Sequence, residues 1–461
     1  MMSPPTIPQI SYTLGQLAFY YKYSPPTTAW SQCLSPLESK SDLRILNFLS
    51  LLLTTGGPAD RAAVSFSYTK DMGLQLFYSK CHPCSNEETY YVTQIFAIAT
   101  NPQLPLPVKH NDLFHLAVMN CKAKISSRLH KASSCLKDLS IRKDFGILDR
   151  NSELEHESNS KPTPCDEYIR RYVDPEMFPN GSSLPQFLKK WFYSFLDTFG
   201  PDSSFVYPFQ AINITRTLHV CYFLVVHPET RKILDPDLYY RLQKLAEYRP
   251  AIAAVIGWMG RFDSEALSTL KVTEIVPSPT SSVDVSGNFL QILDKYARYT
   301  GSVGVTDKDL CTSYGRMRSF PVSLENKITL HSHSGCFLAL ALAKRFFATT
   351  IPIVLNIGCA KPMCWICLEY LATIHHCYPH ITICTTPNNR RINSTWMIPP
   401  GTPCEVATTM YERLGTALNS VITTCGSNSE RWHNPLSETE FADSMQYWIS
   451  ICKDRRLAMK P

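Results

Sequence analysis

The sequence predicts an α/β fold, in which a mixed sheet with flanking helices in the C-terminal half follows a mostly α-helical N-terminal region. Two observations predict it. Between residues 328 and 385, strand-like segments alternate with helical segments of about 12 residues, which is typical of βαβ units. Between residues 41 and 145, apolar residues mostly recur at spacings of three and four, which favours helices.

The individual elements follow from the same patterns. In the C-terminal half we expect strands at residues 328–331, 353–357 and 380–385, and helices at 336–347 and 364–376. In the N-terminal half we expect helices at 45–53, 184–200 and 235–259. Two segments rich in β-branched and aromatic residues, AVSFSYT at 63–69 and TYYVTQIFAIAT at 89–100, favour strands or short buried segments.

Composition excludes several classes of protein. The 461 residues are 44% hydrophobic and 18% charged, which indicates a globular chain that is too long for one small binding module. The net charge of +6 is small, and like charges form no long block, which argues against a dedicated electrostatic nucleic-acid binder. The 17 cysteines are an odd number, which favours thiols or metal ligands over a disulfide framework.

We divide the chain into three predicted parts. Residues 1–271 form the helical N-terminal region, with a polar loop at about 148–166; residues 272–425 form the α/β domain; residues 426–461 form a helical tail. The start of the sequence lacks a signal-peptide pattern, and no apolar run reaches about 18 residues. These features predict an intracellular protein, cytoplasmic or nuclear, that has no membrane partner.

Metal-ligand residue types gather at two predicted strand-to-helix junctions. His331 and His333 precede one helix, and Cys364 and Cys367 form a CxxC pair at the start of the next. One histidine and two thiolates are three zinc ligands, and three protein ligands leave a fourth position open, as in catalytic zinc sites. Cys359 is interpreted as a buried residue at the strand end, with contact to the metal as the alternative.

These motifs resemble those of a known family. The branch called nucleic acid/nucleotide deaminase-like, a fungal-type branch of the zinc-dependent cytidine deaminase-like superfamily, carries a V-H-A-E-like turn, an I-G-C-S-K-x-x-C-x-x-C segment and an aromatic-x-(I/V)-P-P segment. This chain reads LHSH at 330–333, IGCAKPMCWIC at 357–367 and WMIPP at 396–400. The resemblance covers about a third of the chain, from residue 272 to 425, and implies a deaminase-like sheet there.

The resemblance implies a function and a set of roles. His331, Cys364 and Cys367 would hold Zn²⁺, which activates a water for hydrolytic deamination of a base in a nucleotide or nucleic acid. The glutamate that transfers the proton stands two residues after the histidine, and that catalytic position is His333 here. If His333 were the ligand instead, Gly335 would occupy the glutamate position. We therefore expect weak or absent activity; the alternative function is a catalytically inactive deaminase-fold binding protein with structural zinc.

Two glutamates are candidate replacements for the missing carboxylate. Glu325 precedes the first strand of the domain, and Glu369 lies in the second helix, where it is expected to point away from the metal. Arg390 and Arg391 are interpreted as solvated charges, with phosphate contact as the alternative.

A second CxxC pair consists of Cys81 and Cys84. We expect no strand-then-helix context around it, so a chance surface loop is favoured over a redox pair. A small zinc site completed by Cys121 or Cys135 is the other alternative. The histidines at the end of the second helix of the domain are expected to be structural: His375, His376 and His380.

Overall fold

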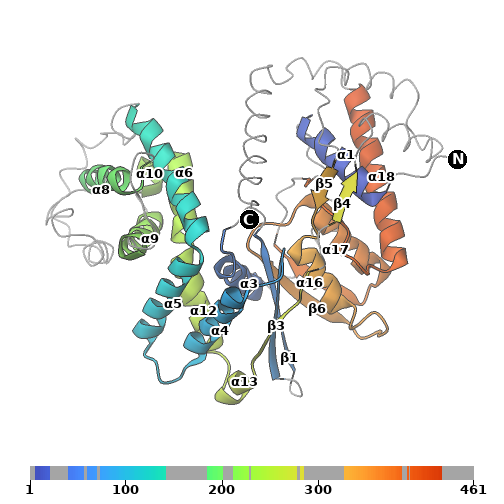
Figure 1. Ribbon diagram of the computed structural model, residues 1–461, viewed down its shortest axis with the longest axis horizontal. Helices are drawn as coiled ribbons and strands as arrows, with labels where there is room; N and C mark the ends of the chain where they lie inside the picture. Colours follow the sequence, from blue (N-terminus) through green and yellow to red (C-terminus); the bar gives the residue numbers. More distant parts are fainter. Residues whose placement is uncertain are drawn as a thin grey trace. The chain divides into compact units, whose positions relative to one another are not determined.

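The computed structural model describes residues 6–20, 40–56, 60–69, 73–141, 184–200, 211–227, 230–277, 281–284, 327–386, 392–393 and 395–427 (Figure 1). The predicted loop at 148–166, Glu325, Arg390, Arg391 and nearly all of the 426–461 tail lie outside the described residues. The chain forms two compact units. We call Glu38–Val276 with Gly358–Lys361 the helical unit, and Met1–Leu37, Pro277–Ile357 and Pro362–Pro461 the site unit.

The described part of the helical unit is mainly α-helix, as predicted. Its helices are α3 (Lys40–Leu52), α4 (Asn86–Thr100), α5 (Leu106–Asn120), α6 (Lys122–Ile141), α8 (Leu184–Phe199), α9 (Ala211–Val226), α10 (Thr230–Ile233), α11 (Pro236–Ala246), α12 (Tyr248–Met259) and α13 (Ser264–Ser268). The prediction of helices at 45–53 and 184–200 is confirmed. The segment at 235–259 contains two helices, α11 and α12, because the helix is interrupted at Glu247, which ends α11 and precedes α12.

Strands of both sequence halves form a mixed five-stranded sheet in the order β3-β2-β1-β6-β7. β1 (Ala62–Thr69) and β2 (Gly73–Lys80) are antiparallel, and β3 (Lys271–Glu274) is parallel to β2. Within the helical unit, Ala63 and Val64 of β1 also pair with Cys359 and Gly358. The coarse prediction of an α/β fold with a mixed sheet is therefore confirmed, as is the strand at 63–69.

The expectation of a strand at 89–100 is wrong, because this segment lies in α4. Its buried residues follow helical spacing: Tyr91, Val92, Ile95, Phe96 and Ala99. A capping box starts the helix, since the Ser85 side chain accepts a hydrogen bond from the Glu88 amide and the Glu88 carboxylate accepts one from the Ser85 amide. This cap and the apolar periodicity outweigh the strand preference of the β-branched and aromatic residues.

The site unit carries the predicted alternation of strands and helices. Its elements are α1 (Ile7–Tyr20), β4 (Ser281–Asp284), β5 (Lys327–Leu330), α16 (Ser334–Ala343), β6 (Ile353–Cys359), α17 (Trp365–Cys377), β7 (Ile381–Thr385) and α18 (Cys404–Ser427). β4 and β5 pair antiparallel, whereas β6 and β7 are parallel and are connected through α17. This βαβ connection positions the start of α17 at the carboxyl end of β6, where the functional residues of such folds gather.

The two units differ from the predicted division in two respects: Gly358–Lys361 belongs to the helical unit, and the N-terminal segment belongs to the site unit. We expected residues 1–271 to form one region, but α1 belongs to the site unit and packs on α18. Its apolar side chains explain the difference, because Ile10 and Leu14 are fully buried and so require a covering partner. Among the described residues, no helix has both the length and the apolar character needed to cross a membrane.

Two glycines of the helical unit provide a matched test of how closely the backbone at Gly358 approaches α3. A Cβ atom at Gly358 would clash with the backbone of Leu46 in α3, whereas a Cβ at Gly257 in α12 would meet nothing within 4 Å. We expect Gly358→Ala to lower the free energy of unfolding by about 1–3 kcal/mol through overpacking. Gly257→Ala should raise it by up to about 1 kcal/mol, because alanine favours the helix. Chemical denaturation measures both, and equal stability of the two variants would contradict the close approach of Gly358 and α3.

Candidate metal centre

Two helix starts in the site unit carry metal-ligand side chains. His333 is the N-cap residue of α16, with φ −69° and ψ 132°, and Cys364 is the N-cap residue of α17, with φ −75° and ψ 163°. Cys367 follows in the first turn of α17 and is 1% exposed. Two equivalent positions, each between a strand and a helix, thus present a ligand atom at a helix N-terminus.

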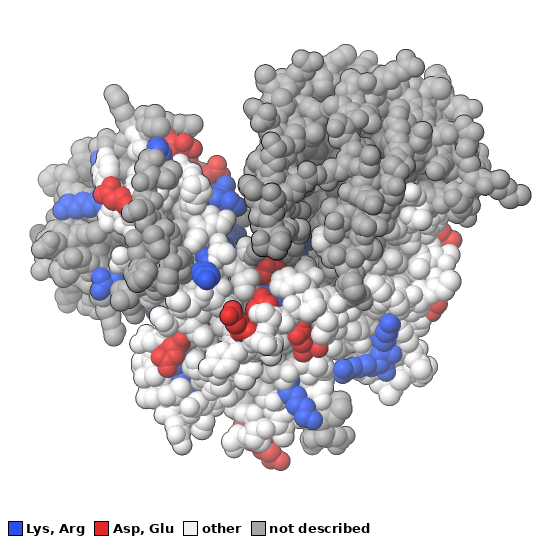
Figure 2. Space-filling view, in the orientation of Figure 1, with Lys and Arg blue, Asp and Glu red and all other residues white. Residues whose placement is uncertain are grey.

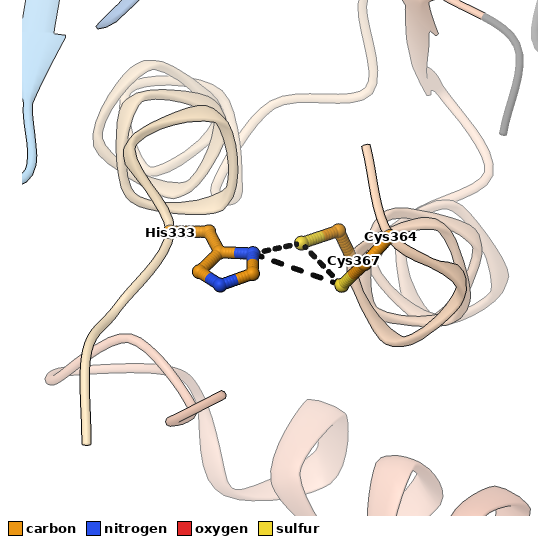
Figure 3. A group of neighbouring side chains, drawn as sticks. All are labelled: His333, Cys364 and Cys367. Carbon is orange, nitrogen blue, oxygen red and sulfur yellow. Dashed lines mark hydrogen bonds between the residues drawn. The ribbon is translucent and has the colours of Figure 1, made fainter. Parts of the chain in front are cut away.

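The three side chains converge (Figure 3). His333 Nδ1 lies 3.0 Å from Cys367 Sγ and 3.7 Å from Cys364 Sγ, and the two sulfur atoms are 3.3 Å apart. All three residues are buried, and their ligand atoms lie within 4.8 Å of one another. Among the described residues, this is the one group of three or more His, Cys, Asp or Glu side chains close enough to hold a metal ion.

Burial controls the protonation of the thiols. Desolvation raises the pKa of Cys364 well above its ordinary value, and the neighbouring Cys367 raises it further, while His333 acts in the opposite direction. Without a metal, the Cys364 thiol is therefore neutral at neutral pH. Metal binding must displace its proton, since the thiolate is the ligand form. The backbone amides and dipole at the start of α17 favour that thiolate.

Asn393 contacts the second ring nitrogen of His333. Its Nδ2 atom lies 2.9 Å from His333 Nε2, and its Oδ1 atom accepts hydrogen bonds from the Thr395 amide at 3.0 Å and the Thr395 hydroxyl at 2.9 Å. Because Oδ1 is engaged by Thr395, the amide nitrogen faces the ring. In this geometry the amide nitrogen donates to Nε2, which orients the ring with its proton on Nδ1. A metal at Nδ1 would move that proton to Nε2 and require the amide to rotate so that Oδ1 accepts it. Asn393 could not be identified from the sequence, since an isolated asparagine in a loop carries no recognisable signal.

The structure places His333, rather than His331, beside the cysteines. The backbone of His331 instead forms a bridge with Trp396: its amide donates to the Thr395 carbonyl, and its carbonyl accepts from the Met397 amide. The assignment of His331 as a ligand and of His333 as the catalytic residue is therefore corrected. The physical reason is the helix start. α16 begins at Ser334, two residues earlier than expected, and this makes His333 the cap residue at the junction.

With His333 among the three grouped residues, the position two residues later is Gly335, which has no side chain to transfer a proton. Glu369 does not replace the missing carboxylate. It is 5% exposed within α17, and its Oε2 atom lies 3.4 Å from the Arg413 guanidinium of α18. Among the described residues, no carboxylate joins the three ligand atoms.

Cys359 is not part of the group, in agreement with its interpretation as a strand-end residue. Its amide donates a hydrogen bond to Asn47 Oδ1 in α3 at 2.8 Å. Gly358 lets the backbone approach α3 closely. The glycine and first cysteine of the IGC segment thus have a packing role in the helical unit.

The second CxxC pair has a structural context that we did not expect, because β2 ends directly before Cys81 and α4 begins directly after Ser85. Burial and the nearby Glu274 carboxylate nevertheless raise the pKa of Cys84 to about 12, which disfavours a reactive thiolate. Neither cysteine forms a disulfide with a described residue, and no metal-binding group of the described residues includes Cys121 or Cys135.

Two of these histidines, one in the last turn of α17 and one directly before β7, contact backbone carbonyls. His375 Nδ1 lies 2.7 Å from the Ile381 carbonyl oxygen, and His380 Nε2 lies 2.9 Å from that of Phe346. These contacts agree with the structural role predicted for them.

The comparisons with known proteins identify no relative: no protein-family model, curated protein or solved structure matches the chain. The candidate site is therefore judged by its own geometry.

The first prediction separates the two histidines. We expect His333→Ala to lose the bound metal, because it removes one of three ligand atoms, whereas His331→Ala should retain it. Metal content of the purified proteins, measured by plasma mass spectrometry, decides between them. Loss of metal in His331→Ala with retention in His333→Ala would contradict the geometry.

A second prediction concerns Asn393. Asn393→Ala should lower metal affinity by about 10- to 100-fold without abolishing binding, because the imidazole loses its orienting partner. Asn393→Asp should restore the affinity, since a carboxylate accepts a hydrogen bond from Nε2–H when Nδ1 binds the metal. Titration of zinc against a chromogenic chelator measures both, with Asn101→Ala as the control. Equal affinities of wild type and Asn393→Ala would rule out this positioning role.

Proposed function

We propose that the protein binds one Zn²⁺ ion through His333, Cys364 and Cys367, and that its site unit is a deaminase-like fold that uses the metal for structure and not for hydrolysis. The observation that carries the proposal is the position of His333 beside the two thiols. In the family that the motifs resemble, the proton-transferring glutamate follows the histidine ligand by two residues, and the residue two positions after His333 is Gly335.

The donor set favours zinc. One imidazole nitrogen and two thiolates are typical zinc ligands, with bonds of about 2.0 Å to nitrogen and 2.3 Å to sulfur. Tetrahedral geometry then separates the sulfurs by about 3.8 Å and each sulfur from the nitrogen by about 3.6 Å. The distances in the chain are 3.3 Å, 3.0 Å and 3.7 Å, so the ligand atoms need to move by only about half an ångström.

The arrangement suits a structural metal, because the ligands connect the starts of α16 and α17. These helices are separated in the sequence by β6, and almost every residue of either helix is buried. A zinc ion held by both helix starts would fix the β5–α16 and β6–α17 junctions together. It would also remove the cost of leaving three polar groups together in an apolar interior.

A bound zinc ion would supply Lewis-acid activation of a water at its fourth position, and this keeps deamination as a second candidate function. The set of three described ligands favours deamination, since structural zinc sites usually have four protein ligands. The absence of a carboxylate in the described group favours the structural role, because general acid–base catalysis contributes about 10²- to 10⁴-fold. A nucleotide or nucleic acid remains the substrate class that the family resemblance suggests.

Charge does not favour nucleic acid as the main partner. On the face drawn in Figure 2, lysine and arginine side chains alternate with aspartate and glutamate over the described surface. Proteins that track a nucleic-acid backbone usually gather basic side chains in one stripe. We therefore place a protein or a small-molecule partner ahead of a nucleic acid.

The experiment that tests the proposal compares stability with activity. Removal of zinc by a chelator, or by Cys364→Ala, should lower the thermal unfolding midpoint by more than about 5 °C, because the metal binds only the folded state. Cys384→Ala is the matched control, since Cys384 is also fully buried but is not in the group. Cys384→Ala should retain zinc, and its unfolding midpoint should fall only by the amount expected for the loss of one small buried side chain.

The same proteins decide the question of catalysis. We expect no ammonia release from cytosine- or adenine-containing nucleotides or single-stranded oligonucleotides above that of the Cys364→Ala variant. Zinc-dependent release that Cys384→Ala retains would overturn the structural role in favour of deamination. A zinc-free wild type with an unchanged unfolding midpoint would overturn the metal site itself.

A further inference from the structure

A cavity of about 440 Å³ lies between α3 and α12 of the helical unit. Both helices are labelled in Figure 1, and all the lining residues belong to the helical unit. The cavity shares no residue with the metal centre. Its volume lies within the range of about 300 to 1,000 Å³ that is usual for small-molecule sites.

The walls of the cavity are apolar and firmly supported. Ile45 and Trp258 are 7% and 3% exposed, so they form part of the core as well as the lining. The indole ring of Trp258 packs edge-on against Phe66 and Phe262, with ring centroids 5.1 Å and 5.2 Å apart. These contacts hold the aromatic wall in place before any ligand arrives, which reduces the entropic cost of binding.

Two arginines line the same cavity. Arg44 and Arg261 are exposed, and the Arg44 guanidinium carbon lies 5.5 Å from the centroid of the Phe48 ring. No lining residue is acidic, and in the described part of the chain neither arginine forms an ion pair with a carboxylate. The cavity therefore combines an apolar interior with excess positive charge.

Gly257 contributes open space to the wall of the cavity. It is an exposed residue within α12 and lines the cavity, and a Cβ atom there would meet nothing within 4 Å. A glycine inside a helix costs about 1 kcal/mol relative to alanine, and neither steric contact nor a left-handed backbone requires it here. A small side chain at this position would therefore meet no obstacle in the cavity.

We propose that this cavity binds a small organic anion, whose aromatic or alkyl body packs against Trp258, Ile45 and Phe48 and whose carboxylate, sulfonate or phosphate group pairs with Arg44 and Arg261. Charge complementarity selects an anion, and the wall of aromatic and aliphatic side chains selects an apolar body. The volume of about 440 Å³ suits a small molecule.

The test uses two fluorescent probes that differ in charge. 8-Anilinonaphthalene-1-sulfonate has an aromatic body and one sulfonate, and N-phenyl-1-naphthylamine has the same body without the charge. The full-length protein should bind the sulfonate at one saturable site, and Arg44→Ala with Arg261→Ala should weaken this binding at least about fivefold while leaving the neutral probe unaffected. Arg231→Ala, an exposed arginine of α10 outside the cavity, is the charge control.

Substitutions at Gly257 test whether the probes bind inside the cavity. Gly257→Trp should abolish binding of both probes, because the side chain enters the cavity, whereas Gly257→Ala should change the affinities by less than about twofold. Circular dichroism and the unfolding midpoint must show that both variants are folded, and both should retain metal. The outcome is therefore independent of the function proposed for the site unit.

Three results would overturn the proposal. One is sulfonate binding that survives Gly257→Trp, since the probe would then lie elsewhere. The second is displacement of the probe by an acidic apolar peptide at a lower concentration than by decanoate, which would assign the cavity to a polypeptide. The third is a concentration-dependent dimer that Gly257→Trp dissociates, which would assign it to a second copy of the chain.

Discussion

The site unit depends on one constraint: the starts of α16 and α17 meet inside an apolar interior and bring three polar groups with them. His333, Cys364 and Cys367 are each less than 9% exposed, so water cannot satisfy them fully. Buried polar groups without adequate partners cost about 1–3 kcal/mol each. In the metal-free state they satisfy one another, through an imidazole–thiol contact at 3.0 Å and a thiol–thiol contact at 3.3 Å. These weak contacts keep the ligand atoms close, which gives a cation a site that is nearly formed.

Much of the fold could be predicted because local patterns determine it. The β6-α17-β7 unit follows from alternating apolar segments, and α11 from the cap residue Asp235 and the proline after it. The register of the sheet could not be predicted in this way. β2 pairs with β3 across almost 200 residues, with Gln75 opposite Lys271, and no local pattern specifies such a partner. α4 shows the other limit, since the strand preference of its residues conflicts with their helical periodicity, and the helix forms because the capping box adds to that periodicity.

The candidate site was also predictable only in part: its two cysteines could be identified from the sequence, but its histidine and Asn393 could not. The two cysteines follow from the CxxC spacing at a helix start, which fixes both sulfurs on one end of α17. The histidine was assigned two residues too early, because identifying it requires the exact first residue of α16, and helix boundaries are the least certain feature of a sequence pattern. Asn393 lies 60 residues from His333, in a loop, so only the folded chain shows their contact at 2.9 Å.

Both units depart from the arrangement that would be most stable, and in each the departure occurs around a space for a ligand. The site unit buries two thiols and an imidazole where aliphatic side chains would pack without polar cost. The helical unit keeps a glycine inside α12 and two arginines without described carboxylate partners beside an apolar cavity. Natural sequences usually satisfy local preferences throughout and violate them at functional positions. The two departures have opposite chemistry, since soft donors in one unit select a cation and guanidinium groups in the other select an anion. If both proposals hold, the protein is better described by a cation and an anion that it binds than by a reaction for which the described residues supply no carboxylate at the site.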